Sequence, residues 1–322
     1  MKNILYLNTS VGSFNRGDDI IMECFRKELG ELFPCDFVYD LPTHVSAFHW
    51  YQVLRKSFAY RTYAHCDYKF VGGSNLLVKD MLTHYPQWNV NIFNYHAFKG
   101  CVLCGVGAGA GDKTNCYTRQ LYRKMLSGDY CHSVRDERSK EYVESLGLKA
   151  INTGCVTMWM LTPEHCQKIP TKKAKNVVFT LTESGIKDGK DQQLIDILCK
   201  NYEDVYFWVQ GNKDFEYINK FERIDKIKIV NPSKDAYEKV LEMGDMDYVG
   251  TRLHAGIYAM RHFVRTIIIA IDERARGINQ SNNLVCIDKQ EMQRLESLIN
   301  SEFTTEIKMP LERIEAWKSQ FK

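Results

Sequence analysis

Short apolar runs alternate with helical patterns along almost the whole chain, and this alternation most constrains the fold. In the first half the predicted strands are residues 4–7, 35–39, 68–71, 101–106, 130–134 and 150–153, and the predicted helices are 18–32 and 137–146. In the second half the predicted strands are 177–181, 205–209, 227–230, 246–249 and 266–270, and the predicted helices are 192–200, 236–242, 252–263 and 311–320. Strands that alternate with helices favour parallel sheets covered by helices.

One polar stretch, LTPEHCQKIPTKKAKN (161–176), interrupts this alternation with two of the seven prolines and four lysines. We interpret it as a linker. A chain of 322 residues also exceeds the size at which single cores stop growing, about 250–300 residues. The sequence therefore predicts an α/β protein with two Rossmann-like domains, residues 1–165 and 166–322, whose parallel sheets face each other across a GT-B-like cleft. We expect the last helix to pack back on the N-terminal domain.

Composition excludes several classes of protein. The net charge of +3 is too small to favour nucleic-acid binding. No apolar run approaches the roughly 20 residues of a membrane span, and we expect no secretion signal and a cytoplasmic location. Eleven scattered cysteines favour reduced thiols over disulfides. Cys101 and Cys104 have CxxC spacing inside a predicted strand, where a structural role is favoured over a metal or redox role.

The segment TRLHAGIYAM (251–260) places Arg252 and His254 in the first turn of a predicted helix. That end of a helix carries partial positive charge and unpaired N–H groups, so cations are disfavoured there unless an anion binds. We therefore expect a phosphate or carboxylate site at this helix end. The alternative is a surface salt bridge for Arg252 beside a core histidine.

The segment SVRDERS (133–139) places Arg135 at the carboxyl end of a predicted strand. Ligands of parallel sheets gather at that edge, and a guanidinium group matches carboxylate or phosphate in shape and charge. Arg135 is therefore a second candidate anion ligand. The alternative is an ion pair with Asp136 or Glu137.

Two glycine turns also follow predicted strands. GVGAGAG (105–111) has four alternate glycines but lacks the G-x-G-x-x-G spacing, so it favours a turn that lines a cleft over an NAD site. GGSNLL (72–77) ends its strand with polar Ser74 and Asn75 at the tip.

The segment NRGDDII (15–21) begins a predicted helix. Gly17 allows a tight turn, and Asp18 or Asp19 is a natural N-cap. Asn15 lies on the loop after the first strand, where we expect it to face the cleft.

Aromatic residues concentrate in two neighbouring segments. Residues 48–70 contain eight aromatics, four Lys or Arg and one acid, and residues 83–98 contain five more aromatics. Such rings can stack on sugars, and together with basic residues they also suit a lipid interface. The alternative is an ordinary aromatic core.

These motifs together resemble the polysaccharide pyruvyl transferase family. The resemblance covers about residues 1–280 and follows the family's order, in NRGDDII, GGSNLL, GVGAGAG, SVRDERS with LGLKAINTG, YVGTRLHAGIYAM and IAIDERARG. It implies a GT-B-like pair of Rossmann domains. It also implies transfer of the enolpyruvyl moiety of phosphoenolpyruvate onto a sugar as a ketal, with release of phosphate, in bacterial capsule or exopolysaccharide synthesis.

The resemblance assigns roles to particular residues. Arg135 and Arg252 bind the doubly anionic donor, and His254 is the general acid, because histidine titrates near neutral pH. The other expected donor ligands are the backbone N–H of Leu253, Gly107 and Asn75. The expected acceptor or cleft residues are Asn15, Asp18, Trp50, Trp88 and Arg274.

The resemblance also implies the partners. Phosphoenolpyruvate is the co-substrate, and no metal or cofactor is expected. The expected acceptor is a sugar of an undecaprenyl-diphosphate-linked oligosaccharide, with peripheral contact at the inner face of the membrane and no nucleic-acid partner. Two other functions stay open: a GT-B glycosyltransferase that uses a nucleotide sugar, and a non-catalytic sugar-binding subunit of a capsule assembly complex.

The chain departs from the family's pattern at two places. Arg265 stands where the family often has a proline, and we expect this change to affect loop stiffness more than chemistry. The family's Tyr-Asp-Pro-Lys is Ile271-Asp272-Glu273-Arg274 in this chain, so that Arg274 would supply the cation.

Overall fold

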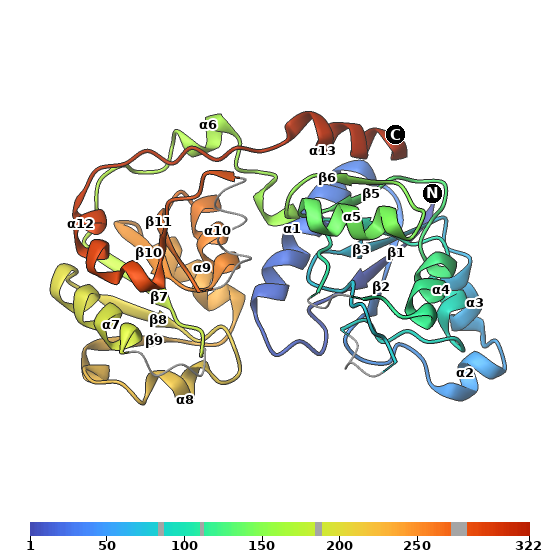
Figure 1. The fold of residues 1–322 in the computed structure, drawn as a ribbon, viewed down its shortest axis with the longest axis horizontal. Helices are drawn as coiled ribbons and strands as arrows, with labels where there is room; N and C mark the ends of the chain where they lie inside the picture. The colour runs from blue at the N-terminus through green and yellow to red at the C-terminus, as the bar shows by residue number, and fades with distance from the viewer. Residues whose placement is uncertain (83–86, 110–112, 184–188, 272–281) are drawn as a thin grey trace. The chain divides into compact units, whose positions relative to one another are not determined.

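The chain forms two compact units, each described by itself. The computed structural model describes all residues except 83–86, 110–112, 184–188 and 272–281 (Figure 1). Unit 1 comprises Met1–Ser13, Ile21–Trp159 and Pro310–Lys322, and unit 2 comprises Phe14–Ile20 and Met160–Met309. The sequence predicts one boundary at 165/166, whereas the contacts divide the chain at 13/14, at 20/21 within its first helix, at 159/160 and at 309/310.

Unit 1 is built on parallel strands. Its main sheet has the order β2-β1-β3-β4, and β5 and β6 form a second parallel pair. The strands are β1 (Asn3–Asn8), β2 (Phe37–Pro42), β3 (Tyr68–Gly72), β4 (Val102–Cys104), β5 (His132–Val134) and β6 (Ala150–Asn152). The helices are α1 (Gly17–Leu32), α2 (Trp50–Leu54), α3 (Phe58–Ala64), η1 (Tyr95–Phe98), α4 (Cys116–Met125), α5 (Glu137–Ser145), η2 (Val156–Met158), α13 (Leu311–Lys318) and η5 (Ser319–Phe321).

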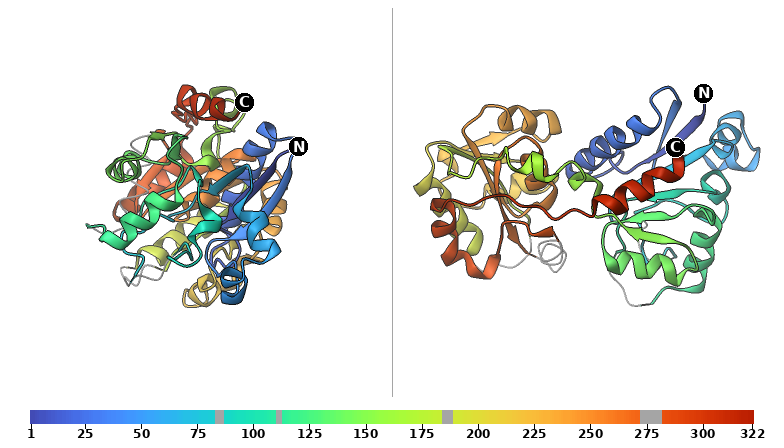
Figure 2. Two further views of the ribbon diagram at one scale, coloured as in Figure 1. Left: turned by 90° about the vertical axis from the view of Figure 1, so that its right-hand side faces the viewer. Right: turned by 90° about the horizontal axis from the view of Figure 1, so that it is seen from above.

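Helices pack on both faces of the main sheet of unit 1 (Figure 2). On one face, α1 and the C-terminal segment bury aromatic rings: Phe25 packs edge-on to Tyr6 of β1, and Phe321 packs edge-on to Phe70 of β3. These contacts explain why residues 310–322 belong to unit 1. On the other face, α3, α4 and η1 contribute to one hydrophobic core with the strands, including Tyr60, Phe98 and Tyr122.

Unit 2 contains one parallel sheet with the order β12-β11-β10-β7-β8-β9. The strands are β7 (Asn176–Thr180), β8 (Val205–Trp208), β9 (Ile227–Val230), β10 (Met246–Gly250), β11 (Arg265–Ala270) and β12 (Cys286–Asp288). The helices are α6 (Pro163–Cys166), α7 (Lys190–Asn201), α8 (Asp214–Ile218), η3 (Ile224–Lys226), α9 (Lys234–Leu241), α10 (Leu253–Arg261), η4 (Lys289–Arg294) and α12 (Leu295–Asn300).

Helices also cover both faces of the sheet of unit 2. Leucine and isoleucine side chains of α7 and α12 share one core with the strands. On the opposite face α10 lies so close that a side chain at Gly256 would meet Ile268 of β11 and Tyr248 of β10. Because all these strands are parallel, their carboxyl ends share one edge of the sheet.

Most predicted strands and helices are present, and Gly147 ends α5 with a left-handed φ of +81°, as a helix C-cap glycine does. The sequence missed β12, the ten-residue helix α4 and the short helices α2, α3, α6, α8 and α12. The loop role expected for Arg265 is wrong, because this residue opens β11 and is 1% exposed. Within the described parts of the chain, no helix is both long and apolar enough to cross a bilayer.

Candidate functional site

The segment around Asn15 pairs with the chain that follows β8 of unit 2. Asn15 and Gly211 form an antiparallel bridge. The Arg16 N–H donates to the Gln210 carbonyl at 2.9 Å, and the Asn212 N–H donates to the Phe14 carbonyl at 3.0 Å. These backbone bonds hold the start of α1 at the carboxyl edge of the sheet in unit 2.

The Asn15 side chain determines where α1 begins. Its Oδ1 accepts the Gly17 N–H at 3.0 Å and the Gln210 Nε2–H at 2.7 Å. The expectation that Asp18 or Asp19 is the N-cap is therefore wrong, because α1 begins at Gly17 and both aspartates lie in its first turn. Acidic groups in a first turn still stabilise the helix through its dipole.

The predicted helix after β10 begins at the same edge. Arg252 is the N-cap of α10, its backbone N–H donates to Thr180 Oγ1 at 3.3 Å, and no side chain caps the helix. The Tyr248 hydroxyl donates to the Arg252 carbonyl at 2.9 Å. Leu253 and His254 are the first two helical residues, so the backbone N–H groups of this turn lie where an anion would bind.

The Arg252 side chain is held by a carboxylate that the sequence analysis missed. Its Nη2 lies 2.5 Å from Asp214 Oδ1, and its Nε donates to the Leu181 carbonyl at 3.2 Å. Asp214 Oδ2 accepts the Gly211 N–H at 2.7 Å. Burial raises the pKa of Asp214, and the Arg252 guanidinium opposes that shift. The salt bridge considered from the sequence thus exists, but its carboxylate is buried rather than on the surface.

This ion pair orients Arg252 without using all of its donors. A guanidinium has five N–H donors, and Nη1 has no partner among the described residues. The side chain stays 18% exposed. Gly211 permits this packing, because a Cβ there would lie 2.6 Å from Arg252 Nη2.

Gly17 lies where the segments NRGDDII and TRLHAGIYAM approach each other in unit 2. An ideal Cβ on Gly17 would lie 2.8 Å from Gln210 Nε2, 3.2 Å from Asn15 Oδ1 and 3.5 Å from His254 Nδ1. The structure therefore brings Asn15 and His254 together, although 239 positions separate them in the sequence. Any side chain larger than hydrogen at Gly17 would crowd this group.

Gln210 is a second residue that the sequence analysis missed. Because Asn15 Oδ1 already accepts the Gly17 N–H, the Gln210 atom facing it must be the amide nitrogen. Gln210 Oε1 is then left buried without a partner among the described residues, in a side chain that is 3% exposed. An unpaired buried acceptor is costly and is often kept for a ligand. The VQGN turn after a predicted strand was the signal available in the sequence.

The candidate residues of unit 1 also lie together. The Gly107 N–H donates to the Ser74 carbonyl at 2.8 Å, which joins the two glycine turns. Arg135 packs over Gly107, where a Cβ would lie 2.3 Å from the Arg135 Cζ. Arg135 Nε lies 3.2 Å from Asp136 Oδ2, so the ion pair considered from the sequence is present.

The tip of the GGSNLL turn has unusual backbone geometry. Ser74 has a φ of +60°, in the left-handed region that residues with side chains rarely adopt. The adjacent Asn75 has a buried Oδ1 without a partner among the described residues. A strained turn with an unpaired acceptor is typical of a functional loop.

The remaining candidate residues are Trp50, Trp88 and Arg274. Trp50 is exposed, but Trp88 is 0% exposed and lies in the core of unit 1, so its expected role as an exposed acceptor-stacking ring is wrong. No face of a fully buried ring is available to a ligand. Arg274 lies outside the described residues.

The burial of Cys101 and Cys104 favours a structural role over a metal or redox role. Both side chains are completely buried. Burial raises the pKa of Cys101 to about 12 and raises that of Cys104 well above its usual range. A metal ligand or redox thiol needs an accessible thiolate, which such burial opposes.

One group of metal-ligand type occurs in the described part of the chain. Ligand atoms of Glu238, Glu242 and His262 lie within 4.8 Å of one another. The Lys234 ammonium group already lies 2.7 Å from Glu238 Oε2, where it competes with a cation. This group is at the opposite end of α10 from His254, and the candidate site does not include it.

Comparisons with known proteins bear on both fold and family. A family model described as "Polysaccharide pyruvyl transferase" matches residues 15–273. Among curated proteins, none matches the sequence significantly. The solved UDP-GlcNAc 2-epimerase from Methanocaldococcus jannaschii has a TM-score of 0.60 at 13% identity, over 99% of this chain and 100% of that one.

Two further structures are similar. The Methanocaldococcus jannaschii enzyme in complex with UDP-GlcNAc and UDP has a TM-score of 0.55 at 12% identity, over 99% of this chain and 100% of that one. The S. aureus MnaA–UDP structure has a TM-score of 0.52 at 13% identity, over 94% of this chain and 88% of that one. At such identities the likeness concerns the fold alone, which is GT-B-like. Because the family match spans most of the sequence, this chain belongs to the polysaccharide pyruvyl transferase family.

Proposed function

We propose that the protein transfers the enolpyruvyl moiety of phosphoenolpyruvate to a hexose and forms a pyruvyl ketal with release of phosphate. The observation that carries this proposal is the group around Gly17, where the NRGD and TRLH motifs of the family meet. A potential proton donor, an arginine and an uncapped helix end then lie at one edge of the sheet in unit 2.

The donor is an anion with a carboxylate and a phosphate, and each unit, taken by itself, has a group of residues that suits an anion. In unit 2, Arg252 Nη1 and the N–H of Leu253 would bind one anionic group. In unit 1, Arg135, beside Gly107 and Asn75, is a separate candidate ligand for an anionic group. Asp214 is a positioning residue in this scheme, because it orients Arg252 and does not itself contact the donor.

His254 would supply the proton for the first step. The protonated imidazole gives its proton to the methylene carbon of phosphoenolpyruvate, and the adjacent carbon becomes oxocarbenium-like. A sugar hydroxyl attacks that carbon and returns a proton to His254. Phosphate then leaves, and a second hydroxyl closes the ketal as its proton passes to phosphate or solvent.

Gln210 supports the acceptor half of the proposal. Its buried Oε1 can only accept a hydrogen bond. The fully ionised donor has no O–H to give, whereas every sugar hydroxyl has one. We assign Gln210 Oε1 to a hydroxyl of the acceptor. Asn15 and Asp18, which lie on the Phe14–Ile20 segment of the same unit, are further candidate acceptor residues. The acceptor is a sugar of an undecaprenyl-diphosphate-linked oligosaccharide for capsule or exopolysaccharide, used in the cytoplasm.

The test is phosphate release from phosphoenolpyruvate in the presence of a panel of lipid-linked galactosides and N-acetylhexosamines. His254→Gln keeps a hydrogen-bonding side chain but lacks the acid, so we expect turnover to fall by about 10²-fold or more. Calorimetric titration is expected to show donor affinity within a few-fold of the parent. His262→Gln, at the other end of α10, is the matched control and keeps turnover. A His254→Gln variant with nearly normal turnover would remove His254 from the proton transfer.

The same assay separates the other candidate functions. A nucleotide-sugar glycosyltransferase would bind or hydrolyse a UDP-sugar and would leave phosphoenolpyruvate intact. A non-catalytic subunit would bind the acceptor and release no phosphate with any donor. Either result would refute the proposed function.

A further inference from the structure

The helical hairpin of α2 and α3 in unit 1 (Figure 1) contributes both buried and exposed side chains. On the packed face, Phe48 and Tyr60 are buried, with their rings 5.0 Å apart. Val53 and Tyr63 also pack against the core of unit 1. These contacts hold the hairpin firmly on the sheet.

The opposite face carries large apolar side chains in water. Trp50 is 76% exposed, Leu54 is 75% exposed and Phe58 is 80% exposed. The three residues follow one another at intervals of four positions across the two helices. Large apolar side chains that are exposed together on a folded surface are typical of an interaction site.

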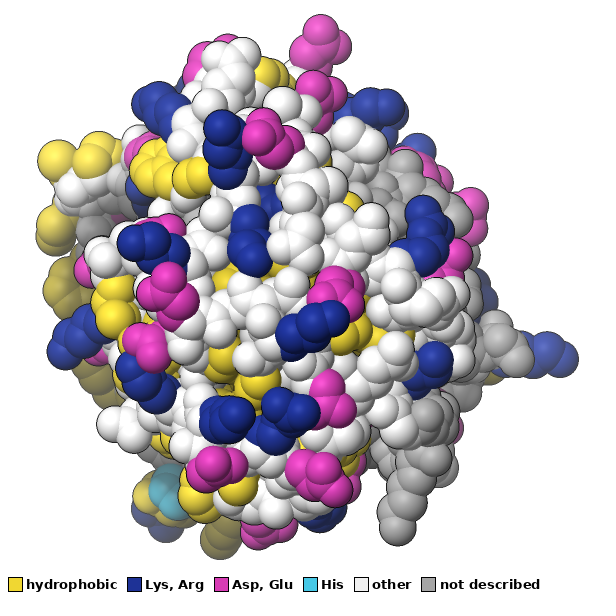
Figure 3. Space-filling model, turned by 90° about the vertical axis from the view of Figure 1, so that its left-hand side faces the viewer, with side chains coloured by type: hydrophobic (Ala, Val, Ile, Leu, Met, Phe, Trp, Pro, Cys, Tyr) yellow, Lys and Arg dark blue, Asp and Glu magenta, His cyan; other side chains and the backbone are white. Residues whose placement is uncertain are grey.

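The α2–α3 hairpin carries basic side chains and no acidic ones. Arg55, Lys56 and Arg61 are exposed, and no acidic residue occurs between Asp40 and Asp67. None of these three cations forms an ion pair with a carboxylate of the described residues. By contrast, the face drawn in Figure 3 mixes basic and acidic side chains.

We infer that the α2–α3 hairpin docks on a membrane surface of anionic lipids. Trp50, Leu54 and Phe58 would enter the boundary between headgroups and acyl chains, as the apolar face of an interfacial helix does. Arg55, Lys56 and Arg61 would lie at the level of the lipid phosphates, where cations are attracted. A protein partner would need acidic groups for these cations, and a sugar polymer would not use Leu54. The lipid surface therefore suits the whole patch best.

Tryptophan fluorescence tests this inference in the full chain without any substrate. The other tryptophans, Trp88, Trp159, Trp208 and Trp317, are all buried, so Trp50 alone is accessible to lipid. With vesicles of phosphatidylglycerol and phosphatidylcholine, we expect a blue shift and quenching by brominated acyl chains. Trp50→Phe keeps an apolar ring, so it is expected to bind vesicles and to lose the quenching.

Co-sedimentation with the same vesicles measures affinity. We expect the triple variant Trp50→Ser/Leu54→Ser/Phe58→Ser to lose at least about tenfold in partitioning. Replacing Arg55, Lys56 and Arg61 by Glu gives a similar loss, and raised salt weakens the parent. Phe215→Ser, which removes an exposed ring of unit 2, is the matched control and binds like the parent. Circular dichroism checks that each variant is folded.

Two outcomes would overturn the inference. The first is a parent protein that does not bind anionic vesicles at low salt. The second is a folded triple serine variant that binds within twofold of the parent, because the lipid contact would then lie elsewhere. Both outcomes are independent of the proposed chemistry, since the assay contains neither donor nor acceptor.

Discussion

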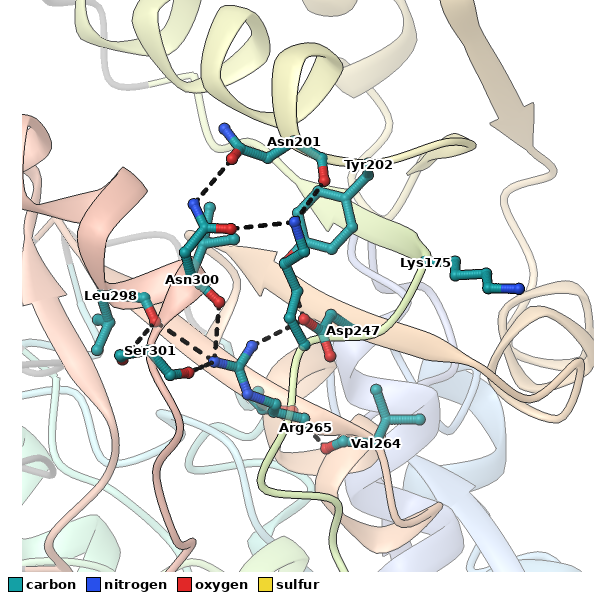
Figure 4. Close-up of polar contacts among 12 residues, drawn as sticks. Lys175, Asn201, Tyr202, Asp247, Val264, Arg265, Leu298, Asn300 and Ser301 are labelled. Atoms are coloured by element: carbon teal, nitrogen blue, oxygen red, sulfur yellow. Dashed lines mark hydrogen bonds and ion pairs between the residues drawn. The ribbon is translucent and has the colours of Figure 1, made fainter.

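Arg265 joins the sheet of unit 2 to the end of α12 (Figure 4). Its Nη1 donates to Asp247 Oδ2 at 2.8 Å. Its Nη2 donates to the carbonyls of Leu298, Ile299 and Ser301 at 3.3, 3.1 and 2.8 Å. The last carbonyls of a helix have no partner within the helix, so this guanidinium satisfies them while it pairs with a buried carboxylate.

We predict that Arg265→Met strongly destabilises unit 2. Methionine has a similar volume, but it leaves Asp247 buried without its cation and removes the donor from three carbonyls. Breaking a buried pair in this way costs about 3–5 kcal/mol. For a unit of about 150 residues, 1 kcal/mol lowers the midpoint of thermal unfolding by roughly 2–4 °C. We therefore expect that midpoint to fall by roughly 6–20 °C.

Differential scanning calorimetry measures this loss, and two further variants identify its cause. Arg265→Met/Asp247→Asn removes the buried charge as well, so it is expected to lose less stability than Arg265→Met alone. Arg294→Met removes an ion pair at 3.0 Å in which both side chains are more than 40% exposed, and such pairs contribute little. An Arg265→Met midpoint within 2 °C of the parent would refute the reasoning.

The same variant also separates stability from function. Asp247 and Arg265 lie near the amino ends of β10 and β11, whereas Arg252 follows the carboxyl end of β10. At a temperature where Arg265→Met is folded, we therefore expect its affinity for phosphoenolpyruvate to match the parent.

The remaining predictions concern the candidate site and the core of unit 1. Arg135→Ala and Arg252→Ala each raise the Kd for phosphoenolpyruvate at least about tenfold by calorimetry, since each removes a charged hydrogen bond; an unchanged Kd excludes that arginine. Gly17→Ala lowers turnover at least about tenfold with little change in the midpoint of thermal unfolding, because its methyl group displaces the Gln210 side chain. Full turnover in this variant would show that residue 17 has room for a side chain. Gln210→Met raises the acceptor KM about three- to tenfold and leaves the donor KM unchanged in steady-state assays; a change in donor KM alone would contradict the hydroxyl contact. Burial lowers the pKa of His132 from 6.5 to about 4. In denaturant titrations we therefore expect the free energy of unfolding to be highest above pH 6.5 and to fall by about 3 kcal/mol towards pH 4. His132→Asn is expected to lose less stability over the same pH range.

The sequence by itself determined the class of fold and the positions of most elements. Hydrophobic periodicity is a local property, so the strands around residues 4–7 and 246–249 and the helices 137–146 and 311–320 were predicted close to their observed places. Short elements such as α2 and β12 were missed, because a few residues carry too little periodicity and their packing partners decide the conformation. The motifs likewise singled out Arg252, His254 and Arg135 as candidates, since their residue types are unusual at the ends of strands and helices.

Only the tertiary structure decided which of these residues lie together. The order of β10, β7 and β8 in the sheet brings the turn after β8 beside the start of α10, and it thereby adds Gln210 and Asp214 to the candidate site. Long-range packing also joins Asn15 to Gln210 in unit 2. In unit 1 it buries Trp88 and leaves Trp50 in water. No local pattern specifies such contacts, because they depend on the free energy of packing segments that are far apart in the chain. The sequence could therefore propose the chemical groups of a candidate site, while the fold alone selected their partners and their exposure to solvent.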